Sequence, residues 1–220
     1  MLARTNICAD HHDGDDQARR LLGLTYQLAA TQLTKLGESD LAWIAADRGL
    51  TAVRPTGDPL ITGSLFRSVG HALHAAARSN DAGTTRTFLA AADHAAGKLG
   101  ADANHLWTAF GPTNVVIHRV ATAAELGDLQ VAIDLGPRVD TAGLPMERRV
   151  RHALEVARAY SSWNRLDDAQ AVLLDAEQMA PEQVRHHFLS RQLALTWVRR
   201  RRGKPSAELV GLAQRLKVLD

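Results

Sequence analysis

The segment from Asn104 to Asn114, NHLWTAFGPTN, carries the densest group of side chains suited to specific binding in this 220-residue chain. It places a His, a Trp, a Phe and two Asn beside a Gly-Pro break, whereas most of the chain is Ala, Leu and Arg at helical spacing. Pro112 lacks an N–H and disfavours the α conformation at Gly111. Two structures therefore remain open: a new helix that begins at Pro112, or one long helix with a kink.

Spacing around the break indicates a shared face. Trp107, Asn114 and His118 are separated by seven and then four residues, so a continuous helix would align them. We predict a groove in which Trp107 forms an apolar floor, Asn and His side chains form hydrogen bonds, and Arg67 and Arg119 neutralise an anion. The predicted ligand-binding residues are Arg67, His71, His74, His105, Trp107, Thr108, Phe110, Asn114, His118 and Arg119.

Simpler roles for the same residues stay open. Trp107 and Phe110 are residue types that usually lie in a core, and the polar residues can cap helix ends or bond backbone exposed by the break. If the chain is an enzyme, the candidate acid/base residues are His118, His105 and His71. His71 and His74 have a possible metal spacing, but no Cys or HExxH pattern accompanies them. We therefore predict no metal site and no cofactor.

Helices must position these residues. Apolar spacing predicts about ten helices from Asp15 onward, in five antiparallel pairs, and no window has the period of a strand. Leu21, Leu24, Leu28 and Leu36 are predicted to form the stripe of the first helix. Asp58 is predicted to cap a helix that begins at Pro59 and extends to about Arg78. Further helices are predicted at 84–99, 145–161 and 167–179.

The turns within successive pairs recur. They fall near Gly37, Asn80, Gly127, Asn164 and Gly203, between 37 and 47 residues apart. A two-helix unit at this period is typical of an α-solenoid. We therefore predict an all-α, right-handed superhelix that forms one domain over residues 15–220, after a flexible leader at residues 1–14.

One unit has a sharper pattern. The segment ALEVARAYSSWNRLDDAQAVLLDAEQMAP places small residues at Ala157, Ala169 and Ala176, and a proline at Pro181 after the second helix. Small residues allow the two helices to cross closely. This unit resembles a tetratricopeptide repeat; the other four are longer and degenerate.

A second resemblance covers most of the chain, from about Gly23 to Pro181. The segments LAWIAADRGLTA, NHLWTAFGPTNVVIHRV, AAELGD and LPMERRVRHALEVARAY resemble the C-terminal helical-repeat domain of actinobacterial helix-turn-helix regulators of the XRE type. The resemblance implies a sensor domain in transcription regulation and brings no catalytic residues. Those regulators begin with a DNA-binding domain, whereas only a short leader precedes the first repeat helix here. We therefore expect either a trimmed chain or a stand-alone relative.

Composition restricts the class of protein. The formal charge is +2, too near balance to indicate a nucleic-acid partner, so direct DNA binding is not expected. Cys8 is the only cysteine, which excludes a disulfide within the chain and fits a reducing cytoplasm. The N-terminus lacks the pattern of a secretory signal, and no apolar run is long enough to cross a membrane.

We expect a regulatory, or sensor, module that binds a small molecule or peptide in a concave groove. One alternative is a stand-alone enzyme of a specialised biosynthetic pathway that uses the same groove, with a His as acid/base. A third is a scaffold for protein–protein interaction that dimerises. An enclosed pocket around the His residues would favour the enzyme, an open groove would favour peptide binding, and a large apolar surface patch would favour the scaffold.

Overall fold

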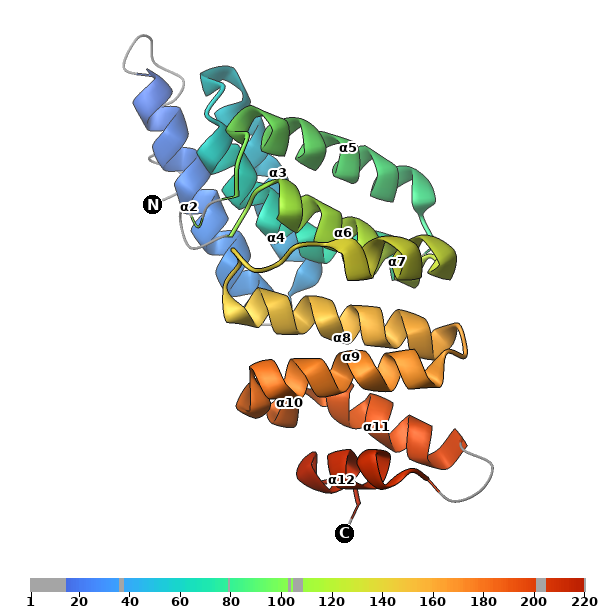
Figure 1. The fold of residues 1–220 in the computed structure, drawn as a ribbon. Coiled ribbons are helices and arrows are strands. Elements are labelled where there is room, and N and C mark those ends of the chain that lie inside the picture. Colours follow the sequence, from blue (N-terminus) through green and yellow to red (C-terminus); the bar gives the residue numbers. More distant parts are fainter. Residues whose placement is uncertain are drawn as a thin grey trace. The chain divides into compact units, whose positions relative to one another are not determined.

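The computed structural model describes residues 15–35, 38–78, 80–102, 104, 109–200 and 205–219, and within these ranges all regular structure is helical. The predicted leader at 1–14 lies outside them. The α-helices are α2 (Asp15–Lys35), α3 (Ser39–Val53), α4 (Pro59–Arg78), α5 (Ala82–Leu99), α6 (Pro112–Glu125), α7 (Leu129–Leu135), α8 (Met146–Ser162), α9 (Leu166–Met179), α10 (Pro181–His186), α11 (Phe188–Arg200) and α12 (Ala207–Arg215) (Figure 1). Two short 3-10 helices, η1 (Arg54–Thr56) and η3 (Gly136–Arg138), follow α3 and α7.

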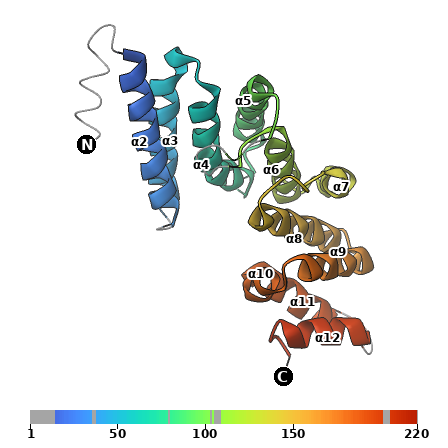
Figure 2. The same ribbon diagram turned by 60° about the vertical axis from the view of Figure 1, so that its left-hand side comes forward.

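The chain divides into two compact units, Met1–Leu126 and Gly127–Asp220. We call them the N-terminal unit and the C-terminal unit. The prediction of a single domain over 15–220 stays a prediction. Within each unit, helices pack mainly on those nearest in sequence: α2 on α3, α3 on α4 and α4 on α5 in the first, and α8 on α9 and α11 on α12 in the second (Figure 2).

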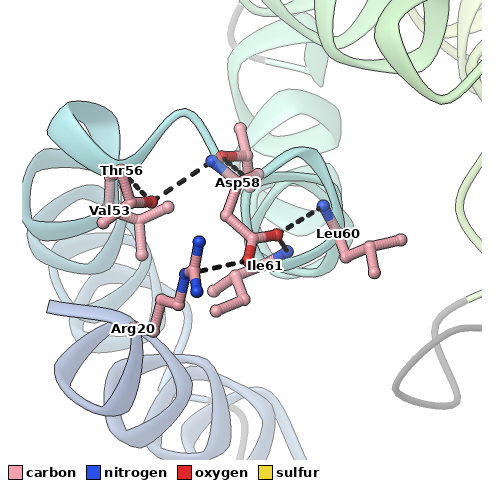
Figure 3. A network of polar contacts seen from close by, with 7 residues as sticks. Arg20, Val53, Thr56, Asp58, Leu60 and Ile61 are labelled. Carbon is pink, nitrogen blue, oxygen red and sulfur yellow. Dashed lines mark hydrogen bonds and ion pairs between the residues drawn. The ribbon is translucent and has the colours of Figure 1, made fainter. Parts of the chain in front are cut away.

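Helix α4 begins with the cap that the sequence predicts. As predicted, Asp58 caps α4: its Oδ1 accepts hydrogen bonds from the backbone N–H of Leu60 at 2.9 Å and of Ile61 at 3.2 Å (Figure 3). Its other carboxylate oxygen pairs with Arg20 of α2 at 3.2 Å. One aspartate thus stabilises the first turn of α4 and ties it to α2.

Small residues let the helices of the N-terminal unit approach closely. A Cβ at Gly63 of α4 would lie 2.3 Å from Cδ1 of Phe110, so only glycine leaves room for that ring. Phe110 itself is buried and packs with Ala95, Ala96 and Val115. Phe110, which precedes the Gly-Pro break, is therefore a core residue. It can pack against α4 because Gly63 has no side chain.

The core of the C-terminal unit matches the repeat pattern. Ala157, Ala169 and Ala176 are each fully buried, as close crossing of α8 and α9 requires, and Leu173 is buried beside them. The Nε1–H of Trp197 on α11 donates to Ser161 Oγ on α8 at 2.8 Å, in the interior. This bond fixes α11 on α8.

A second polar pair joins α9 to α12. Glu177 accepts two hydrogen bonds from Arg215, at 2.7 and 2.6 Å. The same bond to Glu177 raises the pKa of Arg215. Bidentate pairing of this kind fixes orientation as well as distance.

Three predicted turn residues have left-handed backbone: Asn80 (φ 59°), Gly127 (φ 82°) and Asn164 (φ 63°). Asn and Gly adopt this conformation at low cost, which explains why these positions end helices. Gly37 and Gly203 lie outside the described residues. The prediction at Pro181 was incomplete: this proline follows α9 but also begins α10, where its missing N–H costs nothing.

The stripe predicted for the first helix was wrong at two of its positions. Leu21 and Leu28 are more than half exposed, whereas Leu22, Tyr26 and Ala30 are buried. The two sets differ by a rotation of about one residue, or roughly 100°, around the helix. Leu24 of the predicted stripe does pack against the core, and Leu36 lies outside the described residues. Among the described helices, none combines the length and the apolar character that a membrane span needs.

Candidate functional site

The Gly-Pro break starts a new helix. Helix α6 begins at Pro112, which settles the choice left open above. Asp102 Oδ1 accepts a hydrogen bond from the backbone N–H of Thr113 at 3.0 Å, so a residue ten positions upstream of Pro112 caps the helix. A Cβ at Gly111 would lie 2.3 Å from Asp102 Oδ1 and 2.7 Å from its Cα, so this contact requires glycine.

Asn114 and His118 lie one turn apart on the face of α6 that packs toward α4. A Cβ at Gly70 of α4 would lie 2.9 Å from Cε1 of the His118 ring, so α4 leaves room for that ring. Both side chains line a narrow cavity of about 20 Å³, together with Phe66, Gly70, Phe88, Leu89, Ala92, Phe110 and Val115. We call it the Asn114 cavity. Its volume suits about one water molecule.

Asn114 is the unusual residue of this cavity. Its side chain is 0 % exposed, and neither Oδ1 nor Nδ2 has a hydrogen-bond partner in the part of the chain that the structure describes. A buried amide without partners costs about 1–3 kcal/mol of folding free energy. Native proteins keep few such groups, and each calls for an explanation such as a ligand, an ion or a bound water.

The other predicted site residues have varied positions. Phe110 is buried and stacks on Phe66, with ring centroids 6.3 Å apart. Arg119 forms an ion pair with Asp93 of α5, so its charge already has a partner. Arg67, His71 and His74 belong to α4, but their side chains are not described. His105, Trp107 and Thr108 lie outside the described residues. Their predicted roles stay predictions.

A larger pocket lies beside this cavity. Its volume is about 410 Å³, and its walls come from α3, η1, the first half of α4, and α5. We call it the α3–α5 pocket. It is lined by Asp47, Leu50, Arg54, Gly57, Pro59, Thr62, Phe66, Thr87, Phe88, Ala91, His94, Ala95 and Lys98. A volume of this size suits a small organic molecule.

The charges of the α3–α5 pocket favour an anion. Arg54 and Lys98 line it with exposed side chains, and His94 lies one turn before Lys98 on α5. Asp47 is the acidic residue of the lining. No ion pair or hydrogen bond within the described residues engages the guanidinium of Arg54 or the ammonium of Lys98. Both charges therefore remain available to a ligand, over a floor of Leu50, Phe66 and Phe88.

Two aromatic rings belong to both hollows. Phe66 and Phe88 line the α3–α5 pocket and also the Asn114 cavity. Phe88 is held edge-on by Trp43 of α3, with ring centroids 4.8 Å apart. Phe66 stacks at the longer distance of 6.3 Å on Phe110. Phe66 and Phe88 thus form a shared wall between the α3–α5 pocket and the cavity that holds the Asn114 amide.

Sequence reasoning did not identify the α3–α5 pocket. A signal was present: Asp47, Leu50 and Arg54 follow helical spacing, as do Ala91, His94 and Lys98. Such spacing shows that residues share a face of a helix. It does not show that the face of one helix meets the face of another.

Metal chemistry finds no support in the described ranges, where His, Cys, Asp and Glu do not form a group of three or more suited to an ion. Comparison of the chain with protein-family models, with curated proteins and with solved structures finds no match.

Proposed function

We propose that this chain is a regulatory module that binds a small amphipathic anion in the α3–α5 pocket. The observation that carries the proposal is a pocket of about 410 Å³ with aromatic walls, lined by two cations, Arg54 and Lys98, that form no ion pair with any described residue. An apolar cavity with a few polar groups is the common form of a small-molecule site. The resemblance to the sensor domains of XRE-type regulators points to the same class of function.

The architecture we propose is a right-handed α-solenoid of about five helix pairs. Within the N-terminal unit, first helices of successive pairs contact each other, α2 with α4 and α4 with α6, as repeats that stack on their neighbours would. The α3–α5 pocket lies between the second helices of two pairs and the start of α4. A ligand there would alter the packing angle of these pairs, and this is how we propose that binding is transmitted.

The test uses 1-anilinonaphthalene-8-sulfonate, an anionic aromatic probe whose fluorescence rises in apolar surroundings. We expect saturable binding to the folded protein. Arg54→Glu with Lys98→Glu should weaken it about tenfold or more, since two attractive charges become repulsive. The matched control is Arg48→Glu with Arg86→Glu, which makes the same charge change on α3 and α5 at exposed positions that do not line the pocket. Equal binding by both double variants would refute the site.

Native mass spectrometry of the protein purified from cells gives an independent check. We expect a mass above that of the chain, with a bound organic anion that is released on denaturation. The same spectrum counts the copies in the assembly.

The dimerising scaffold remains a second candidate because one observation favours it. Four large apolar side chains are at least 44 % exposed on the first two helices: Leu21 and Leu28 on α2, and Leu41 and Ile44 on α3. These residues lie on two helices that pack on each other, and a contiguous apolar patch on such helices would mark an interaction surface. A dimer that Leu28→Lys converts to a monomer would support this function, and a monomeric wild-type chain would exclude it.

The enzyme alternative gains no such observation within the described residues. Of its three candidate residues, His105 and the side chain of His71 are not described, and His118 lines a cavity of about 20 Å³.

A further inference from the structure

The buried amide of Asn114 has features of a binding position. It is 0 % exposed, and neither of its polar atoms has a partner among the described residues, although Thr122 on the same helix donates its hydroxyl to a backbone carbonyl at 2.8 Å. Helix α6 therefore satisfies one buried polar side chain and leaves another open. The cavity beside Asn114 has room for about one water-sized group.

The neighbouring pocket shares part of its lining with the Asn114 cavity. Phe66 and Phe88 are the residues shared by the two linings. Both rings are half-buried: Phe88 packs edge-on against Trp43 at a centroid distance of 4.8 Å, and Phe66 stacks on Phe110 at 6.3 Å. Rotation of the Phe66 side chain would connect the α3–α5 pocket with the Asn114 cavity.

The ligand must match three zones in order. Arg54 and Lys98 attract an anionic group, and Leu50, Phe66 and Phe88 take an apolar body. Beyond Phe66, the Asn114 amide offers both a donor and an acceptor. A hydroxyl group uses both, because it can donate to Oδ1 and accept from Nδ2.

We propose, on the premise that the α3–α5 pocket binds a ligand as argued above, that Asn114 forms its inner hydrogen-bonding subsite. The ligand class is an elongated organic anion with an apolar body and a hydroxyl or carbonyl group at the far end. Phe66 turns aside when that group enters, and the ligand supplies hydrogen bonds to Oδ1 and Nδ2 of Asn114.

The experiment compares pairs of ligands that differ only at the far end. Octanoate, decanoate and dodecanoate, each with its ω-hydroxy counterpart, displace the anilinonaphthalene sulfonate probe from the full chain. Three chain lengths are used so that the test does not depend on an assumed distance between Arg54 and Asn114. At the length that fits, we expect the ω-hydroxy acid to bind about tenfold more tightly than the plain acid.

Asn114→Leu should remove this preference, because an apolar side chain of similar size cannot bond the hydroxyl. Thr122→Val is the matched control: it also removes a buried polar group from α6, but away from the cavity lining, and should keep the preference. A second measurement needs no variant. In wild-type protein, the side-chain amide resonance of Asn114 should shift with the ω-hydroxy acid and stay in place with the plain acid.

The outcomes separate the two proposals. If the probe does not bind, the ligand-binding function fails and the subsite with it. If the probe binds and both acids compete equally at every length, only the subsite is overturned, and Asn114 holds a structural water. If Asn114→Leu does not fold, the amide resonance decides the matter in the wild-type chain.

Discussion

The two units treat buried polar groups differently. In the C-terminal unit, Trp197 donates to Ser161 at 2.8 Å, and Glu177 pairs twice with Arg215 at 2.7 and 2.6 Å. In the N-terminal unit, Asn114 is fully buried without a partner, beside a pocket of about 410 Å³. These two pairs of the C-terminal unit fix helix packing. Asn114 of the N-terminal unit has no such bond within the described residues, which is expected of a site shaped by function at the expense of stability.

The largest expected effect tests whether the buried Trp197–Ser161 pair stabilises the C-terminal unit. Trp197→Ala removes a side chain that is 1 % exposed and also leaves Ser161 unpaired. We expect a loss of about 3–5 kcal/mol in the free energy of unfolding of the C-terminal unit, from the cavity and the lost bond. Hydrogen exchange followed by mass spectrometry would resolve the loss by segment.

Trp163→Ala is the matched control, because Trp163 ends α8 with 44 % of its surface exposed. It should cost less than about 1 kcal/mol. If both tryptophans cost the same, the interior of the C-terminal unit is less tightly packed than the comparison requires.

The second prediction contrasts two substitutions that should change the free energy of unfolding in opposite directions. Ser161→Ala should destabilise by about 1 kcal/mol, because it leaves the Trp197 N–H buried without an acceptor. Asn114→Leu should leave stability unchanged or raise it by about 1–2 kcal/mol, because it removes a buried amide that has no bonds to lose. Chemical unfolding followed by circular dichroism measures both. A large loss for Asn114→Leu would show that the amide already has a structural partner, and the contrast between the units would disappear.

The difference between the units also explains what the sequence could predict. The C-terminal unit follows a short-range rule: Ala157, Ala169 and Ala176 recur where two helices cross, and all three are fully buried. Helix starts were equally readable, since Asp58 caps α4 through its own first turn. The cap depends on residues two and three positions apart, and the alanine pattern on residues of one helix pair.

The candidate site depends on contacts between helices, and here the sequence was less informative. Asn114 and His118 were placed correctly on one face of α6, but spacing could not reveal that this face meets α4 at Gly70. In α2, leucines at positions 21 and 28 suggested a buried stripe, yet Tyr26 and Ala30 are the buried residues. An amphipathic pattern fixes the period of a helix, and rotation about its axis is decided by the neighbours.

The third prediction tests the pair between α9 and α12. Glu177→Gln keeps the shape of the side chain but removes its charge, so the bidentate bond to Arg215 loses strength. Because Arg215 is 46 % exposed, water screens the pair, and we expect a loss of only about 1 kcal/mol. Glu208→Gln, a like change on exposed α12 surface, should cost less than half as much. Equal losses would mean that the pair contributes no specific stability.

The smallest effect concerns His152, a buried histidine of the C-terminal unit with a hydrogen bond at only one of its two ring nitrogens. His152 bonds the carbonyl of Gly136 through Nε2 at 2.9 Å, while Nδ1 is buried without a partner. Burial lowers the pKa of His152, and it also lowers the pKa of His187, where Arg151 adds to the effect. The unfolded chain takes up these protons at the ordinary histidine pKa near about 6.5, and the folded unit takes them up only at lower pH. The unfolded state therefore binds more protons in this window, and stability should fall as pH drops below about 6.5.

Hydrogen exchange of α8 peptides across this range should show faster opening at the acidic end. His152→Gln should flatten the dependence, because glutamine has no proton to gain, and His187→Gln should remove a further part. An unchanged slope in the double variant would assign the pH dependence to other groups. It would also mean that the folded unit accommodates His152 as well as it accommodates the paired polar groups Ser161 and Glu177.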